Sequence, residues 1–116
     1  MTATDHRRAL GAGGEEAVAA WYQARGYEVV VRNWRCREGE LDLIVRSGRS
    51  FVFCEVKTRT TDAFGAPVEA VTRAKQDRMR RLAARWIDEA PVRPREIRFD
   101  VASVLAGRIE VLEGAF

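Results

Sequence analysis

Two acidic residues and a lysine in the middle of the chain are of the types that bind divalent metal ions and phosphate groups. Asp42 lies in the segment GELDLI at residues 39–44, and Glu55 and Lys57 lie in FCEVK at residues 53–57. Carboxylate oxygens are the ligands that Mg²⁺ prefers, with waters or phosphate oxygens completing the coordination. A nearby lysine can stabilise negative charge that develops on a phosphate. These residue types predict phosphate-ester hydrolysis, provided that the fold brings them together.

The turn between the two segments decides whether these residues meet. Residues 47–50 read SGRS, and glycine in the first central position suits a two-residue type II′ hairpin turn. In that register Asp42 lies opposite Glu55, and Glu40 lies opposite Lys57. Directly opposed residues share a face, with Cβ atoms about 4.5–5.5 Å apart. Two carboxylates at that distance repel unless a cation lies between them, so the register predicts a metal site.

The strand that carries Glu55 and Lys57 is predicted to be central and buried. The preceding residues 51–54, FVFC, are apolar on both faces of a strand, and Glu55 and Lys57 share one face because they are two residues apart. Charges at the end of a buried strand are unfavourable unless they are paired or used. These residues alone leave two interpretations open, which are a metal site and a structural salt-bridge cluster.

The remaining pattern indicates an α/β fold. A helix is expected over about residues 7–25, with Leu10, Gly14, Ala17 and Trp21 on its apolar face and with Gly26 after its end. A second helix is expected after Thr72 as N-cap, with a buried stripe that includes Met79 and Trp86. Strands are expected at 27–33, 40–46, 51–58, 96–105 and 108–112, and a polar loop at 59–67. This order predicts a mixed sheet covered by helices.

Composition and length limit the possible classes of protein. The 116 residues suit a single domain, residues 1–116, in which we expect residues 1–7 to be flexible. The net charge of +3 permits nucleic-acid binding without demonstrating it. No apolar run reaches membrane-spanning length, and the polar start has no apolar signal segment behind it, so we expect a cytoplasmic protein. Cys36 and Cys54 are then expected to be reduced thiols, with Cys54 in the core.

Several further charged residues allow two interpretations each. Glu15 could be a metal ligand or an ordinary acidic residue near a helix N-terminus. Lys75 could reach a phosphate or cover apolar surface with its stem, and Arg59 has a similar ambiguity. Asp100 is expected to be structural. A basic stripe on the second helix could be a solvated face or could follow a phosphate backbone, and it consists of Arg78, Arg81 and Arg85.

Taken together, these segments resemble the YraN-like family of small bacterial proteins, which are similar to the PD-(D/E)XK nuclease superfamily and its archaeal Holliday-junction resolvases. The resemblance covers nearly the whole chain. It rests on GAGGE at 11–15, GY at 26–27, RNWR at 32–35, GELDLI at 39–44, FCEVKTR at 53–59, FG at 64–65, Lys75, RFDV at 98–101 and EGAF at 113–116. It implies a restriction-endonuclease-like core with a mixed four- or five-stranded sheet flanked by helices.

The resemblance also implies roles for individual residues. Asp42 would be the first acidic ligand of the superfamily, and Glu55 and Lys57 would form its acid-x-Lys element. Glu15 would occupy the place of the extra acidic residue found in resolvase-like members. The chain departs from the superfamily pattern at Leu41, where a proline is common, and at Cys54, where valine is more usual.

The expected function is therefore that of a Mg²⁺-dependent (or Mn²⁺-dependent) endonuclease. It would hydrolyse phosphodiester bonds in DNA, including branched or otherwise structured DNA. Asp42, Glu55 and Glu15 would hold the metal, and Lys75, Arg59 and Arg78 would contact the nucleic acid. Resolvase-like relatives suggest a homodimer. The alternative is a non-catalytic nucleic-acid-binding adaptor that keeps the nuclease fold, and a third interpretation is a structural protein-interaction domain.

Overall fold

The structure of the protein, a computed structural model, describes residues 3–59 and 71–116, of which residues 3–12 are described by their backbone alone. The chain is α/β in these residues, as the sequence predicted. Its elements are α1 (Ala3–Gln23), β1 (Glu28–Cys36), β2 (Gly39–Ser47), β3 (Ser50–Arg59), α2 (Arg73–Glu89), β4 (Glu96–Leu105) and β5 (Arg108–Leu112).

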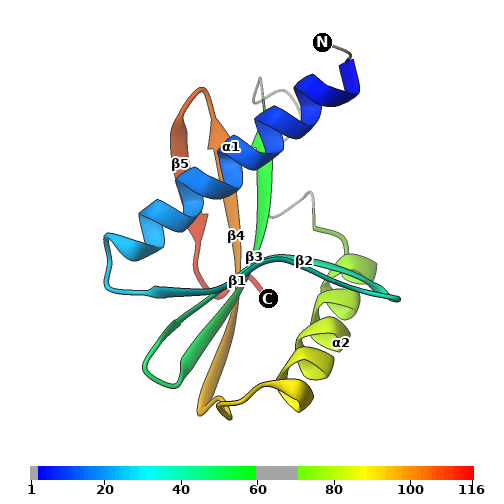
Figure 1. Cartoon of the computed structure of the whole chain (residues 1–116), viewed down its shortest axis with the longest axis vertical. Helices are drawn as coiled ribbons and strands as arrows, with labels where there is room; N and C mark the ends of the chain where they lie inside the picture. The colour runs from blue at the N-terminus through cyan, green and yellow to red at the C-terminus, as the bar shows by residue number, and fades with distance from the viewer. Residues whose placement is uncertain (1–2, 60–70) are drawn as a thin grey trace.

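The five strands form one mixed sheet in the order β1-β2-β3-β4-β5. β3 and β4 run parallel because α2 connects them, and the other neighbouring pairs are antiparallel hairpins. Figure 1 shows the strong twist of this sheet, with α1 crossing it near one end and α2 packed beside it near the other. A mixed sheet with two covering helices is consistent with the expected restriction-endonuclease-like core.

β3 lies at the centre of the sheet and is buried on both faces. Val52 and Cys54 belong to a core cluster with α1, whereas Phe51 and Phe53 belong to a second cluster with α2. Successive side chains of a strand point to opposite faces, so α1 and α2 cover opposite faces of the sheet. The uninterrupted apolar run at residues 51–54 correctly predicted this central position.

α2 has the start and the buried face that its sequence predicts. The Thr72 side chain caps the helix by accepting a hydrogen bond of 3.2 Å from the backbone N–H of Lys75. The helix ends at Glu89, shortly before Pro91. Its buried side chains recur at helical spacing and are Met79, Leu82, Ala83 and Trp86.

α1 differs from its prediction in its start and in its buried face. It begins at Ala3, before the expected start near residue 7. The buried residues are Gly14, Val18, Ala19 and Tyr22, whereas Trp21, which was expected to face the core, is half-buried: it packs against the edge of the core beneath the guanidinium of Arg25. The side chain of Leu10 lies outside the described residues. Residues 1–7 were expected to be flexible. Residues 1–2 of this segment also lie outside the described residues, and the flexibility stays a prediction.

The rotation of α1 has a physical cause in the buried carboxylate of Asp100. The Tyr22 hydroxyl donates a hydrogen bond of 2.6 Å to Asp100 Oδ2. The guanidinium of Arg98 donates two more, and the backbone N–H of Gly114 donates another. A buried charge is tolerated only when it is satisfied in this way, so facing Tyr22 inward stabilises this arrangement. Asp100 is structural, as expected.

The loop expected over residues 59–67 lies, apart from Arg59, outside the described residues. Within the described ranges, neither helix is both long and apolar enough to span a membrane.

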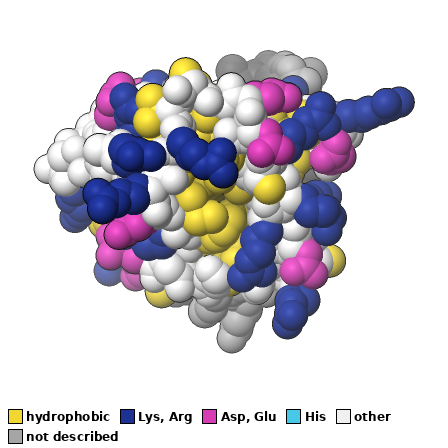
Figure 2. Space-filling model, turned by 90° about the horizontal axis from the view of Figure 1, so that it is seen from below, with side chains coloured by type: hydrophobic (Ala, Val, Ile, Leu, Met, Phe, Trp, Pro, Cys, Tyr) yellow, Lys and Arg dark blue, Asp and Glu magenta, His cyan; other side chains and the backbone are white. Residues whose placement is uncertain are grey.

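The end of the molecule that carries the β2–β3 turn has a small apolar hollow of about 30 Å³. It lies where the end of α2 meets the sheet, and its lining includes Phe51, Trp86 and Val92. Figure 2, the view onto this end, shows hydrophobic side chains near the middle of the face with Lys and Arg side chains around them. A hollow of this size holds no more than a water-sized group, so it offers no site for chemistry.

Candidate metal centre

The hairpin between β2 and β3 has the predicted register. A type II′ turn requires a positive φ at its first central residue only. Gly48 has φ +61°, and the φ of Arg49 is not positive. Ser47 pairs with Ser50, and the pairing continues to Leu43 with Cys54. Asp42 and Glu55 are the next residues beyond that last pair.

At Asp42 the regular pairing stops and a side chain replaces it. Asp42 Oδ2 accepts a hydrogen bond of 2.9 Å from the backbone N–H of Val56. On the other side of β2, the pairing with β1 is interrupted at the level of Asn33, which has φ +52°. Beyond this level Leu41 packs with α2, although Leu43, two residues away, packs with α1. The end of the β1–β2 hairpin is therefore turned towards α2.

This turn encloses a cleft of about 260 Å³ between the hairpin and α2. The tip of the hairpin is attached to the helix by an ion pair between Glu38 and Arg85. Gly39 approaches α2 so closely that a Cβ at this position would lie 3.3 Å from Leu82 Cδ1. The cleft is lined by Gly39, Glu40, Asp42, Glu55, Lys75, Arg78, Met79 and Leu82. Carboxylates from the sheet thus share the cleft with cations from the helix.

Asp42 has an electrostatic environment that disfavours its negative charge. Burial and the charge of Glu55 raise the pKa of Asp42 to about 7, against the lowering effect of the hydrogen bond from Val56. The charges of Glu15 and Glu40 contribute in the same direction. A carboxylate held in this way gains most from a bound cation.

Glu15 belongs to the same group of acidic residues, although it comes from α1. Burial raises the pKa of Glu15, as do the charges of Glu40 and Glu55, while a hydrogen bond with Asn33 opposes the shift. Glu15 does not line the cleft itself. Its charge is therefore coupled to the acidic residues of the cleft from outside the cleft lining.

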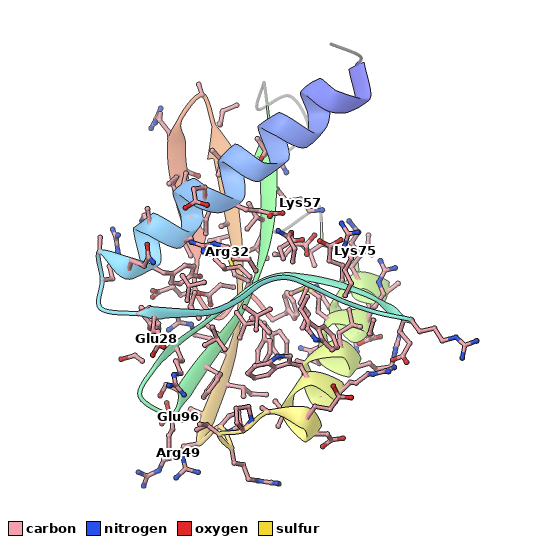
Figure 3. The ribbon with its side chains drawn as sticks, in the orientation of Figure 1. Glu28, Arg32, Arg49, Lys57, Lys75 and Glu96 are labelled. Atoms are coloured by element: carbon pink, nitrogen blue, oxygen red, sulfur yellow. The ribbon has the colours of Figure 1, made fainter. Side chains whose placement is uncertain are left out.

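Lys57 lies directly against one of the two central carboxylates. Its Nζ is 3.1 Å from Glu55 Oε1, and the two side chains are only 23% and 18% exposed. Burial acts to lower the pKa of Lys57, but the hydrogen-bonded ion pair with Glu55 and the charge of Asp42 outweigh it, so the pKa is raised. Figure 3 shows Lys57 and Lys75 near each other, far from Glu28, Arg49 and Glu96 at the other end of the sheet.

The three residues predicted to contact nucleic acid have different positions. Lys75 and Arg78 line the cleft, and Lys75 lies in the first turn of α2, where the helix dipole adds positive potential. The neighbouring ammonium of Lys57 and burial lower the pKa of Lys75. Arg59 ends β3, two residues beyond Lys57. Arg85, from the predicted basic stripe, is paired with Glu38, so the stripe is in part an anchor for the hairpin.

The side chains present fit a magnesium ion better than a transition metal. Among residues 3–59 and 71–116, no three His, Cys, Asp or Glu side chains form a ready-made metal-binding group. Mg²⁺ commonly uses only one or two carboxylates and completes its octahedron with waters and phosphate oxygens. Asp42 and Glu55 provide such a pair of hard oxygen donors in one cleft, where burial and the charge of Glu55 raise the pKa of Asp42.

Glu40 is a cleft residue that the sequence reasoning did not assign to the site. It lines the cleft beside Asp42, and its carboxylate is 3.4 Å from Arg35 Nε. The signal was available, because the hairpin register that placed Asp42 opposite Glu55 placed Glu40 opposite Lys57. Asn33, whose positive φ marks the break in β1, carried no comparable signal.

Comparison with known proteins gives a consistent result. The model of the uncharacterised protein family UPF0102 matches residues 14–104, which include Asp42, Glu55, Lys57 and Glu15. A UPF0102 protein of Beutenbergia cavernae is 55% identical, covering 91% of this chain and 94% of the relative. Those of Frankia alni (51% identical, 93% and 94% covered) and Mycolicibacterium vanbaalenii (49%, 97% and 93%) are similar over comparable lengths. The family expected from the sequence is thereby confirmed, and the chain belongs to UPF0102.

Proposed function

We propose that the protein is a metal-dependent endonuclease that hydrolyses phosphodiester bonds in DNA, including branched or otherwise structured forms. The observation that supports this most strongly is the half-buried carboxylate of Asp42 beside Glu55, in a cleft that also contains Lys75 and Arg78. Carboxylates for a metal and cations for a phosphate, in one cleft, are the two requirements of this reaction.

The sheet residues would bind the metal. Asp42 and Glu55 would contribute oxygen ligands, and Glu15 would add negative charge directly or through water. A bound Mg²⁺ or Mn²⁺ would lower the pKa of a coordinated water and polarise the scissile phosphate. The hydrogen bond from the backbone N–H of Val56 fixes the orientation of the Asp42 carboxylate before any metal arrives.

The cationic residues would bind and orient the phosphate. Lys57 is held against Glu55, a residue of the cleft, and close to Lys75, and it would stabilise the negative charge that develops on the phosphate oxygens. Lys75 and Arg78 would hold the neighbouring backbone, with Arg59 beyond them. Such contacts recognise the phosphate backbone and its shape rather than base sequence.

One observation favours the alternative, a nucleic-acid-binding adaptor without turnover. Glu55 already has a cationic partner in Lys57, and the acidic residues around it are not arranged as a ready-made metal-binding group of three among the described residues. A protein that retained the fold for binding alone would keep the basic residues of the cleft and would not need a metal. This alternative predicts DNA binding that is sensitive to salt and indifferent to divalent ions.

The test is cleavage of labelled linear, single-stranded and four-way-junction DNA with Mg²⁺ or Mn²⁺. Wild type is compared with Asp42→Ala and Lys57→Ala, and the matched controls are Glu28→Ala and Arg49→Ala, which change the same charges at the other end of the sheet. We expect metal-dependent cleavage that both site variants lose and both controls keep. Absence of cleavage by pure, folded wild type, with DNA binding intact, would support the adaptor instead.

A further inference from the structure

The ammonium group of Lys57 already forms an ion pair with Glu55, a carboxylate that the proposed metal would need as a ligand. Its Nζ lies 3.1 Å from Glu55 Oε1, in a pair whose side chains are both mostly buried. Removing such a pair from water is unfavourable unless the charges stay in contact. Lys57 therefore neutralises Glu55 in the absence of a metal.

We infer that Lys57 is a built-in counter-ion that holds the place of the divalent cation, and that metal binding exchanges the metal for the Lys57 ammonium on Glu55. The inference rests on the proposed function, because it takes Asp42 and Glu55 as the metal ligands. It adds that metal affinity is limited by a competing group within the chain.

The balance of charge explains why exchange would occur. Lys57 carries one positive charge, whereas Asp42 and Glu55 together carry two negative charges when both are ionised. The lysine neutralises one of them, and the negative charge of Asp42 remains disfavoured by burial and by the nearby Glu55. A dication neutralises both, so it can displace the lysine even though the lysine is covalently held in place.

The displaced ammonium would face two cations of the neighbouring cleft. The side chain of Lys75 approaches that of Lys57, and Lys75 and Arg78 both line the cleft. Released from Glu55, Lys57 would join two other cations, and this cluster would need an anion to stabilise it. A phosphate is the natural acceptor, so metal and phosphate should bind cooperatively, each raising the affinity for the other by the same factor.

Calorimetric titration of the full chain with Mn²⁺ tests the exchange without any measurement of cleavage. Lys57→Met keeps an unbranched side chain, one atom shorter than lysine, and removes its charge, and we expect it to bind Mn²⁺ about tenfold more tightly than wild type. Arg46→Met is the matched control, because Arg46 forms an ion pair with Glu28 in the same sheet, away from the cleft. It should bind as wild type does. Glu55→Gln should lose binding.

A second measurement does not depend on any variant. In wild type titrated with Mg²⁺, the NMR signals of the Lys57 side chain should shift as the site fills, while those of Arg46 should not. Circular dichroism establishes that each variant is folded before its titration is interpreted.

The outcomes separate this inference from the proposed function. Tighter binding by Lys57→Met supports the exchange, including the case in which wild type binds too weakly to measure. Equal or weaker binding by Lys57→Met, or unshifted Lys57 signals while Mg²⁺ binds to wild type, overturns the exchange and leaves a metal site in place. If neither wild type nor Lys57→Met binds metal, both the exchange and the metal-dependent function are wrong.

Discussion

Asn33 and Asp42 lie at the same level of β1 and β2, and the pairing of these strands is interrupted there. The pairs on either side are Arg32 with Leu43 and Trp34 with Leu41. Asn33 adopts φ +52°, a left-handed conformation that Asn tolerates better than most residues. The register is the same on both sides of this level, and the Asp42 carboxylate lines the cleft there. The candidate centre thus lies at a local irregularity and not at a regular strand pair.

Asp42→Asn should stabilise the metal-free protein at alkaline pH. The pKa of Asp42 is raised from 3.8 to about 7 by burial and by Glu55, so the folded state holds this proton more tightly than the unfolded state does. Its contribution to stability is then present at low pH and is lost as the pH rises towards 7. Asparagine keeps the acceptor for the Val56 N–H and carries no charge. We expect a gain of about 1–2 kcal/mol in the free energy of unfolding at pH 8.

Urea denaturation of wild type and Asp42→Asn at pH 3.5 and pH 8 measures this effect. The difference between the two proteins should be small at pH 3.5, where Asp42 is mostly protonated in both the folded and the unfolded wild type, and it should grow as the pH rises from about 4 to about 7. Saturating Mn²⁺ at pH 8 should stabilise wild type and leave the variant unchanged. A gain that is equal at both pH values would show that the charge of Asp42 is not its cause.

Gly14 and Gly13 should respond in opposite ways to the same substitution. A Cβ on Gly14 would lie 2.1 Å from Thr58 Oγ1 and 3.3 Å from Thr58 Cβ, whereas nothing lies within 4 Å of a Cβ on Gly13. Gly14→Ala should therefore cost about 1–3 kcal/mol through overpacking, while Gly13→Ala should gain about 0.5–1 kcal/mol through helix propensity. Thermal unfolding compares them, and Thr58→Ala should recover much of the loss in the double variant. A stabilised Gly14→Ala would show that α1 does not contact β3 this closely.

Tyr22→Phe should destabilise the fold without affecting the cleft. The variant loses the hydrogen bond of 2.6 Å from the hydroxyl to the buried Asp100 carboxylate, while Arg98 and Gly114 continue to donate to it. The expected cost is about 1.5–3 kcal/mol, as for hydrogen bonds to charged groups. Urea denaturation measures it. Mn²⁺ affinity should stay at the wild-type value, and a loss of affinity would connect the Asp100 network to the metal site.

Lys75 and Arg85 should contribute differently to DNA binding. Lys75 lines the cleft, so Lys75→Ala should remove about one phosphate contact. The slope of log affinity against log salt concentration should then be smaller by about one. Arg85 is engaged by Glu38 at the hairpin tip, so Arg85→Ala should leave that dependence nearly unchanged. Fluorescence anisotropy with a labelled oligonucleotide at several salt concentrations gives both slopes. Equal reductions would show that the arginine stripe of α2 contacts DNA as a whole.

The amino-acid sequence by itself determined the features that depend on neighbouring residues. The glycine in SGRS specified the two-residue turn, and the turn specified the register from Ser47 to Leu43. Thr72 specified the start of α2, and the apolar run at residues 51–54 specified a central strand. These features follow from local backbone preferences and from alternation, which a sequence displays directly.

Only the tertiary structure decided the features that depend on contacts between distant residues. The buried face of α1 includes Tyr22 because Asp100, 78 residues later, requires a donor. Leu41 and Leu43 face different helices because the pairing breaks at Asn33, which neither hairpin turn reveals. The pairing of Lys57 with Glu55, and its approach to Lys75 on α2, likewise depend on packing across the sheet. Burial and charge at these points are properties of the assembled fold, so no local pattern could have predicted them.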